Sequence, residues 1–298
     1  MLTIFSVPKP FLGHTGIIQQ NAIHTWSCLR PACEIILCGD DPGTEQTAAR
    51  FKAKFISNVM RNEHGTPLLN SVFDQVGKVA SHDLMCFVNA DIILLDDFIK
   101  AVERIRFQSF LMVGQRWDID LREPVNFDRL DWEKQLRNYV ASHGALHPPT
   151  GSDYFVFPRS SGIGKLPAFA VGRPGWDNWF IYNARRLRVP VIDATRVVTV
   201  IHQNHDYSHV PNQKGETWEG PEADTNRKRA GGLGHVFTLL DATHQMTSSA
   251  VLPAIGYKYL RRRWQTLSVL IPVVGPLTRF LNLTLVRFLR RGGPQTPR

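Results

Sequence analysis

Cysteine is scarce in this sequence, and its few thiols form no recognisable pattern. The 298 residues include four cysteines, Cys28, Cys33, Cys38 and Cys86, and no two of them form a C-x-x-C pair. Three lie in apolar surroundings, which is typical of buried free thiols in a reducing compartment. We therefore expect a cytoplasmic protein, and the absence of Cys and His at finger spacing disfavours a zinc site.

Long apolar runs are absent as well. The longest apolar region, Leu267–Val274, is too short to cross a bilayer. The first residues, MLTIFSVPKPF, do not place a basic leader before a long apolar run, so we expect no signal peptide. The composition is otherwise that of a globular protein, with 43% hydrophobic and 20% charged residues and enough length for one large core.

Three common signatures of nucleotide-binding and hydrolytic proteins are also missing. No G-x-G-x-x-G follows the first apolar run, and Gly162-Ile163-Gly164-Lys165 lacks the spacing and the Ser/Thr of a phosphate-binding P-loop. No G-x-S-x-G nucleophile elbow occurs. Any nucleotide chemistry must therefore use a different arrangement.

Positive charge is in excess, and it is concentrated near one end of the chain. The net charge is +9, which is compatible with nucleic acid, anionic lipid or phosphorylated ligands. The first two hundred residues are closer to balance, so the excess belongs to the tail and not to a recognition face spread over the fold. The basic residues in the last quarter of the chain include Arg227, Lys228, Arg229, Arg261, Arg262, Arg263, Arg279, Arg287, Arg290, Arg291 and Arg298.

Residues 251–298 alternate arginines with aromatic and leucine side chains, a pattern typical of basic amphipathic helices in a membrane interface. The alternative is two helices that pack on the main domain with their arginines exposed. We favour an anionic membrane surface, reached from the inner face, because the arginines cluster beside aromatic residues. Nucleic acid is not the expected partner, since no recognised module precedes the tail.

Short apolar runs alternate with helical patterns through the first half. This alternation predicts an α/β protein with a Rossmann-like, mostly parallel sheet flanked by helices. We expect this domain over residues 1–210, a loop-rich linker over 211–250 and the helical basic tail over 251–298. The predicted strands of the first half are Leu2–Val7, Glu34–Cys38, Lys54–Val59, Leu84–Val88 and Phe110–Val113, and the predicted helices are Gly16–Leu29, Thr44–Ala53, Thr66–Val79 and Asp96–Arg106.

Polar or turn-forming residues follow each of the first four strands. Parallel sheets bind ligands beyond the carboxyl ends of their strands, so these residues should share one edge. Asp91 interrupts the apolar stretch CFVNADIILLDDF, where a carboxylate is costly to bury unless it is paired or holds a metal. With the amide oxygen of Asn89 it suits Mg²⁺ or Mn²⁺ on a diphosphate. The alternative is a strand that simply ends in a turn.

This order of motifs over residues 2–207 resembles the GT-A family of nucleotide-sugar glycosyltransferases (family 2-like). In that family an acidic D-x-D motif or a variant follows a buried strand about a third of the way along, and V-N-A-D occupies that place here. The departure is Asn89, where many members have Asp. The resemblance implies a GT-A fold, a nucleotide-diphosphate sugar donor, a divalent Mg or Mn cation and a hydroxyl acceptor.

The resemblance also implies roles for individual residues. The loop after the first strand and Asp40-Asp41 would cradle the nucleoside, although D-D-P-G is also a turn. Asp177, at the start of a late helix, would be the general base of an inverting reaction, although a first-turn Asp is common on helices. The implied nucleotide site is Pro8, Asp40, Asp41, Arg61 and Asn62, the metal site is Asp91, Asn89 and His202 or His205, and the sugar or acceptor site is Asp153, Arg173 and Trp176.

We therefore expect an enzyme that transfers a hexosyl or related sugar, with inversion favoured, to a glycan or lipid-linked acceptor in polysaccharide biosynthesis. Two alternatives remain open. A nucleotidyltransferase would carry a glycine-rich basic loop after its first strand, and Pro8–Gly13 fits that poorly. A non-catalytic, membrane-associated protein with a glycosyltransferase-like fold is the other, because Asn89 replaces the usual Asp.

Overall fold

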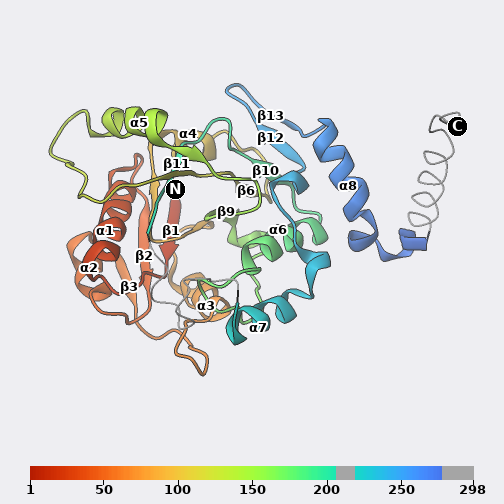
Figure 1. The fold of residues 1–298 in the computed structure, drawn as a ribbon, viewed down its shortest axis with the longest axis horizontal. Helices are drawn as coiled ribbons and strands as arrows, with labels where there is room; N and C mark the ends of the chain where they lie inside the picture. The colour runs from red at the N-terminus through yellow and green to blue at the C-terminus, as the bar shows by residue number, and fades with distance from the viewer. Residues whose placement is uncertain (206–218, 277–298) are drawn as a thin grey trace, which may run out of the picture. The chain divides into compact units, whose positions relative to one another are not determined.

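A sheet of nine strands organises the chain, and its order is not the order of the sequence. The computed structural model describes residues 1–205 and 219–276, and its ribbon is shown in Figure 1. Five neighbouring strand pairs are parallel and three are antiparallel, so the expected mostly parallel sheet is confirmed. The strands lie in the order β13 (Val251–Pro253), β12 (His244–Met246), β10 (Val191–Asp193), β6 (Leu111–Val113), β9 (Tyr154–Pro158), β4 (Leu84–Val88), β1 (Leu2–Ser6), β2 (Glu34–Cys38) and β3 (Lys54–Ile56).

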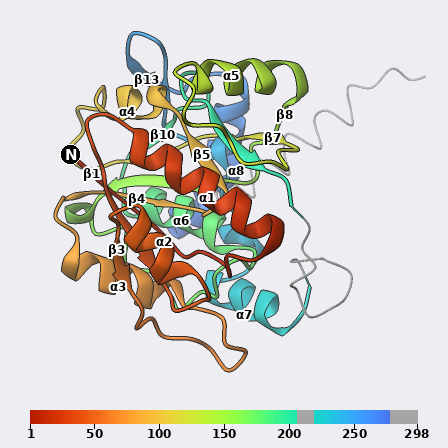
Figure 2. The ribbon, with the colours of Figure 1, turned by 90° about the vertical axis from the view of Figure 1, so that its left-hand side faces the viewer.

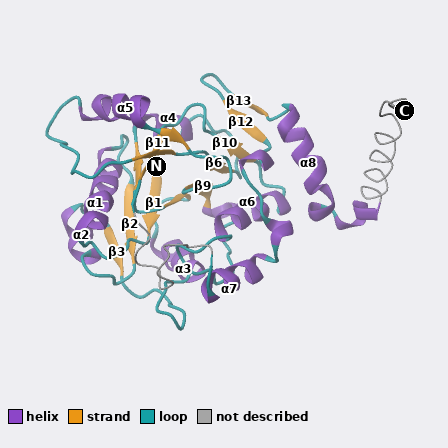
Figure 3. Cartoon of the chain, in the orientation of Figure 1, coloured by secondary structure: helices purple, strands orange, loops and turns teal. Residues whose placement is uncertain are grey.

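Helices cover both faces of this sheet. Successive strand residues point to opposite faces, and apolar residues occur on both of them. Ile4 and Cys86 belong to a core cluster with Trp26 of α1. The neighbouring strand residues Phe5 and Phe87 face the opposite way and make edge-on and stacked contacts with the ring of Phe73 on α3. Figures 2 and 3 show the helices, which are α1 (Gly13–Cys28), α2 (Thr44–Arg50), α3 (Leu69–Val79), α4 (Asp96–Val102), α5 (Trp132–His143), α6 (Trp176–Arg186), α7 (Pro221–Ala230) and α8 (Tyr257–Leu270).

A second, four-stranded sheet of short strands was not expected from the sequence. Its order is β5 (Ile92–Leu94), β11 (Val200–Gln203), β7 (Trp117–Ile119) and β8 (Ala145–Leu146). Strand β11 pairs antiparallel with β5 and parallel with β7, and His202 is in register with both Ile92 and Asp118. The small sheet therefore brings the residue after Asp91, the late histidine and Asp118 to one place.

Several predicted boundaries are wrong, for physical reasons that the structure shows. Helix α3 starts at Leu69 and not at Thr66, because Pro67 and Leu68 are engaged in isolated bridges with Arg61 and Ala170. The third strand ends at Ile56. The apolar residues 197–201 predict a strand that ends before His202, but the strand found there is β11 (Val200–Gln203), so His202 lies within it.

The range 211–250, expected to be a loop-rich linker, contains regular structure in its described part. Helix α7 begins at Pro221, directly after Gly220, as is usual for a proline at the first helical position. Strand β12 joins the large sheet parallel to β10. These elements therefore belong to the sheet domain and do not form a linker.

The chain divides into two compact units, Met1–Ala254 and Ile255–Arg298. The described part of the second unit holds α8, and residues 277–298 of the expected basic tail lie outside the described residues. Among the helices that the structure describes, none has both the length and the apolar character needed to cross a membrane. All four cysteines are free thiols.

Candidate functional site

A cavity of 670 Å³ opens at the carboxyl ends of β1, β2 and β4. Strand β9 runs antiparallel to β4, so the residues just before it, Ser152 and Asp153, reach the same edge. The first turns of α6 and α7 and the end of β11 complete the wall. Of the residues implied by the resemblance, those that line the cavity are Pro8, Asp41, Arg61, Asn89, Asp91, Asp153, Arg173, Trp176, Asp177, His202 and His205.

Two implied nucleotide-site residues do not line the cavity. The carboxylate of Asp40 is 65% exposed and pairs with Arg61, whose guanidinium also binds Asp41 at 2.9 Å. Asn62 accepts hydrogen bonds from the backbone of His64 and Thr66 and so closes its own loop. The ion pair of Arg61 and Asp41 joins the segments that follow β3 and β2 at the cavity wall.

Asp91 lies in the turn between β4 and β5 and meets two histidines. Its Oδ2 is 2.9 Å from Nε2 of His205 and 3.7 Å from Nε2 of His202. The ligand atoms of the three residues lie within 4.8 Å of one another. Among the described residues, Oδ1 of Asp91 is buried and has no hydrogen-bond partner. A buried oxygen without a partner next to two imidazoles fits a divalent cation, because carboxylate and imidazole are common ligands of such ions.

The charges around Asp91 favour its ionised form. Burial alone would raise the pKa of Asp91, but the hydrogen bond from His205 and the nearby His202 and Lys9 hold that pKa well below its ordinary value. The carboxylate is therefore available as an anionic ligand at neutral pH.

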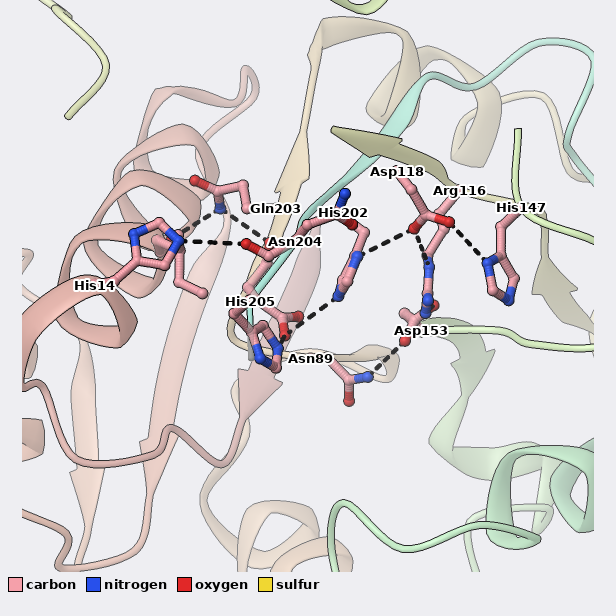
Figure 4. Close-up of polar contacts among 12 residues, drawn as sticks. His14, Asn89, Arg116, Asp118, His147, Asp153, His202, Gln203, Asn204 and His205 are labelled. Atoms are coloured by element: carbon pink, nitrogen blue, oxygen red, sulfur yellow. Dashed lines mark hydrogen bonds and ion pairs between the residues drawn. The ribbon is translucent and has the colours of Figure 1, made fainter. Parts of the chain in front are cut away.

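Asn89 does not join this cluster. Its side-chain amide nitrogen donates to Oδ1 of Asp153 at 2.8 Å, and its backbone N–H donates to the carbonyl of the same residue at 2.9 Å. Figure 4 shows the Asn89 side chain directed at Asp153. Its role as a metal ligand therefore stays a prediction.

Sequence reasoning missed three residues behind the cluster. Asp118 accepts from Nε of Arg116 at 2.8 Å, from Nδ1 of His147 at 2.8 Å and faces Nδ1 of His202 at 3.1 Å (Figure 4). Arg116 also pairs with Asp153. The alternation R-W-D-I over residues 116–119 was the only signal, and a three-residue strand is too short for such a pattern to stand out.

Asp177 occupies the first turn of α6, after Gly175 in the left-handed region with φ 98°. Burial raises the pKa of Asp177 to about 6; the backbone N–H of Asn178 opposes this rise and the Asp153 carboxylate adds to it. A carboxylate with a pKa near the operating pH is suited to accept a proton. Trp176 is buried, with its ring centroid 5.1 Å from those of Phe87 and Phe155, so it is largely a packing residue at the cavity wall.

Arg173, implied as a diphosphate ligand, is already paired. Its Nε and Nη2 donate to Oε2 of Glu222 at 3.0 and 2.7 Å, and Asn62 donates to the other oxygen of Glu222 at 2.6 Å. The Arg173 and Glu222 side chains are 11% and 9% exposed. Glu222 thus ties α7 to both the loop after β3 and the segment before α6, a role that no sequence pattern indicated.

Comparisons with known proteins give a fold but no close relative. No family model matches the sequence, and no curated protein is significantly similar to it. GalNAc-T7 in complex with UDP, GalNAc and Mn²⁺ superposes with a TM-score of 0.51 at 12% identity, over 77% of this chain and 48% of that one. Glucosyl-3-phosphoglycerate synthase from Mycobacterium tuberculosis, in complex with Mn²⁺, UDP and phosphoglyceric acid, gives 0.46 at 17% identity, over 78% of this chain and 79% of that one.

Proposed function

From the premise that this chain has the GT-A fold of nucleotide-diphospho-sugar transferases, we propose that it is a glycosyltransferase. It moves a sugar from a nucleotide-diphosphate donor to a hydroxyl acceptor. The observation that carries this proposal is the cluster of Asp91, His202 and His205 at the end of β4, inside a cavity large enough for a small-molecule donor. GalNAc-T7 was solved with a nucleotide and Mn²⁺, which supports the same ligand class here.

Asp91, His202 and His205 would hold a Mg²⁺ or Mn²⁺ ion. Two imidazoles beside one carboxylate favour Mn²⁺, because Mg²⁺ prefers oxygen ligands. The ion supplies positive charge to the diphosphate that leaves with the nucleoside. Asp41, after β2, and Arg61, after β3, pair with each other at the cavity wall and would offer the nucleoside an acceptor and a donor.

Asp177 would take the proton from the acceptor hydroxyl in an inverting transfer of a hexosyl or related sugar. Its position at the cavity wall and its raised pKa support this assignment. In a retaining reaction Asp177 would only position the acceptor. The buried Arg173 would reach a phosphate only by exchanging its partner Glu222 for it.

Titration calorimetry of the protein with UDP and with GDP tests the proposal. We expect one nucleotide to bind at least about tenfold more tightly when Mn²⁺ is present, because a cation held by Asp91, His202 and His205 would add positive charge for the phosphates. Binding of neither nucleotide, with or without Mn²⁺, would contradict the proposal and favour a non-catalytic protein. Release of pyrophosphate from a nucleoside triphosphate and a sugar phosphate would instead identify a nucleotidyltransferase.

For the second unit we propose contact with an anionic membrane surface, which would suit a lipid-linked or envelope glycan acceptor at the inner face. Tyr257, Leu260, Arg261 and Trp264 lie at helical spacing on one side of α8. Tyr257 is 76% exposed, Leu260 is 50% exposed and Trp264 is 41% exposed. Aromatic and cationic side chains on a common helix face are typical of binding in the interface.

Arg261→Glu tests this contact. Sedimentation with vesicles containing phosphatidylserine should show a partition coefficient about 30-fold lower, since reversing one charge removes roughly 2 kcal/mol of attraction. Lys78→Glu on the exposed part of α3 makes the same change in net charge and should leave partition unchanged. If the partition coefficient falls equally in both variants, membrane binding depends on overall charge and not on this helix face. If it falls in neither variant, the proposed surface is wrong.

A further inference from the structure

The two ring nitrogens of His202 have different partners. Nε2 faces Oδ2 of Asp91 at 3.7 Å, and Nδ1 lies 3.1 Å from Oδ1 of Asp118, which is within ion-pair distance but without hydrogen-bond geometry. The ring is 8% exposed, so neither nitrogen is freely solvated. Residues 202 and 118 are in register between the parallel strands β11 and β7, and both side chains therefore project from the same face of the small sheet. Strand pairing, and not a loop, sets this contact.

The carboxylate of Asp118 is itself fixed in place. Arg116 donates to its Oδ1 at 2.8 Å, and Nδ1 of His147 lies 2.8 Å from its Oδ2. Arg116 continues to Asp153, which accepts from Asn89. Figure 4 shows this row of contacts. The contacts run from Asn89 through Asp118 and His202 to Asp91. The backbone between residues 89 and 91 closes this row of contacts into a ring.

We propose that Asp118 is a positioning residue for the metal site: it keeps the proton of neutral His202 on Nδ1 and so leaves the lone pair of Nε2 directed at Asp91. This inference rests on the proposed function, since the Nε2 lone pair matters only if the cluster binds a cation. A histidine ligand commonly donates its other N–H to a carboxylate, and that partner fixes both the tautomer and the ring orientation.

The same network explains why residue 89 is an asparagine. Asp118 and Asp153 already share the single guanidinium of Arg116. A carboxylate at position 89 would lie where the amide nitrogen now donates to Asp153 at 2.8 Å, with like charges in contact. The amide of Asn89 carries no charge, but it donates a hydrogen bond to Asp153. It therefore keeps the row of contacts that leads to His202.

Two measurements test the role of Asp118. In the metal-free wild-type protein at alkaline pH, long-range ¹H–¹⁵N correlation spectra should show His202 with Nδ1 protonated, with the assignment taken from His202→Gln. In the Asp118→Asn variant the affinity for Mn²⁺, in the presence of whichever of UDP and GDP the wild-type protein binds, should fall about 10- to 100-fold, as is usual when the partner of a histidine ligand is lost. Asp128→Asn, an exposed carboxylate outside the cavity, should leave that affinity unchanged.

The outcomes separate this inference from the proposed function. Failure of the wild-type protein to bind Mn²⁺ with either UDP or GDP would overturn the proposed function. Tight binding by both wild type and Asp118→Asn, or a His202 protonated on Nε2 in the metal-free protein, would overturn only the role of Asp118. The spectrum of the wild-type protein decides the question even if Asp118→Asn does not fold.

Discussion

Asp91→Asn should lower the rate of donor turnover by at least about 10³-fold while the protein remains folded. The substitution keeps the shape of the side chain but removes the only carboxylate of the candidate metal cluster, and with it the anionic ligand next to His202 and His205. Charge stabilisation of a leaving diphosphate is worth several kcal/mol, and each 1.36 kcal/mol corresponds to a factor of ten in rate. The measurement is release of nucleoside diphosphate from the donor, with and without acceptor.

The fold of this variant should persist, because the backbone carbonyl of Asp91 also joins the turn to β11, and that contact does not depend on the Asp91 side chain. Gln203 donates to that carbonyl at 2.9 Å from its side chain. Asp74→Asn, on an exposed position of α3 outside the cavity, is the matched control and should have wild-type turnover and wild-type thermal stability. Wild-type turnover by Asp91→Asn would refute the assignment of the metal site.

The sequence was sufficient for strands β1, β2, β3, β4 and β6 of the large sheet and for part of the cavity wall, whereas β12 and β13 fall in the ranges expected to be linker and tail. Apolar runs such as Leu84–Val88, each followed by polar residues, mark buried parallel strands and the edge where ligands bind. That rule placed Asp41, Asn89 and Asp91 correctly at one cavity. The GT-A resemblance added the late histidines, which meet Asp91 in the structure.

The small sheet could not be predicted in the same way. Strands β5 and β7 have three residues each, too few for a periodic pattern, and their pairing with β11 joins segments about a hundred residues apart. Asp118 acquires its role only through that pairing. Glu222 is a similar case, because its partner Arg173 lies 49 residues away. In both examples long-range pairing of charges, and not local pattern, determines what the residue does.

Asn89 is the departure of this chain from the D-x-D motif, and the structure gives its amide a partner. From the sequence, an amide in place of a carboxylate raised doubt about metal dependence. In the structure the amide partners Asp153, and the cluster that fits a cation is formed by Asp91 and two histidines without it. Metal binding by this cluster and the role of Asn89 both stay predictions, which the affinity for Mn²⁺ tests.

Asp177→Asn should reduce transfer to the acceptor about 10²- to 10⁴-fold, the usual loss when a general base is removed. Binding of Mn²⁺ and nucleotide should not change, because Asp177 is not part of the Asp91 cluster. Asp224→Asn is the matched control, since Asp224 also lies in the first turn of a helix, α7, but is 60% exposed and absent from the cavity wall. It should have the wild-type rate of transfer.

The pH dependence gives the sharper test of Asp177. Burial raises the pKa of Asp177 from 3.8 to about 6, so the base is ionised and the wild-type rate should rise as pH increases through about 6 and then level off. The raised pKa means that the folded state binds this proton more strongly than the unfolded state. Stability should therefore fall between about pH 4 and pH 6, by up to roughly 3 kcal/mol.

Asp177→Asn cannot ionise, so above pH 6 it should be at least as stable as the wild-type protein while being far less active. Thermal unfolding and transfer rates measured on the same samples over this pH range check both statements. An active variant that keeps the wild-type pH profile would show that Asp177 is not the base and would favour a retaining reaction. A variant that loses activity together with stability would instead identify Asp177 as a structural residue of the first turn of α6.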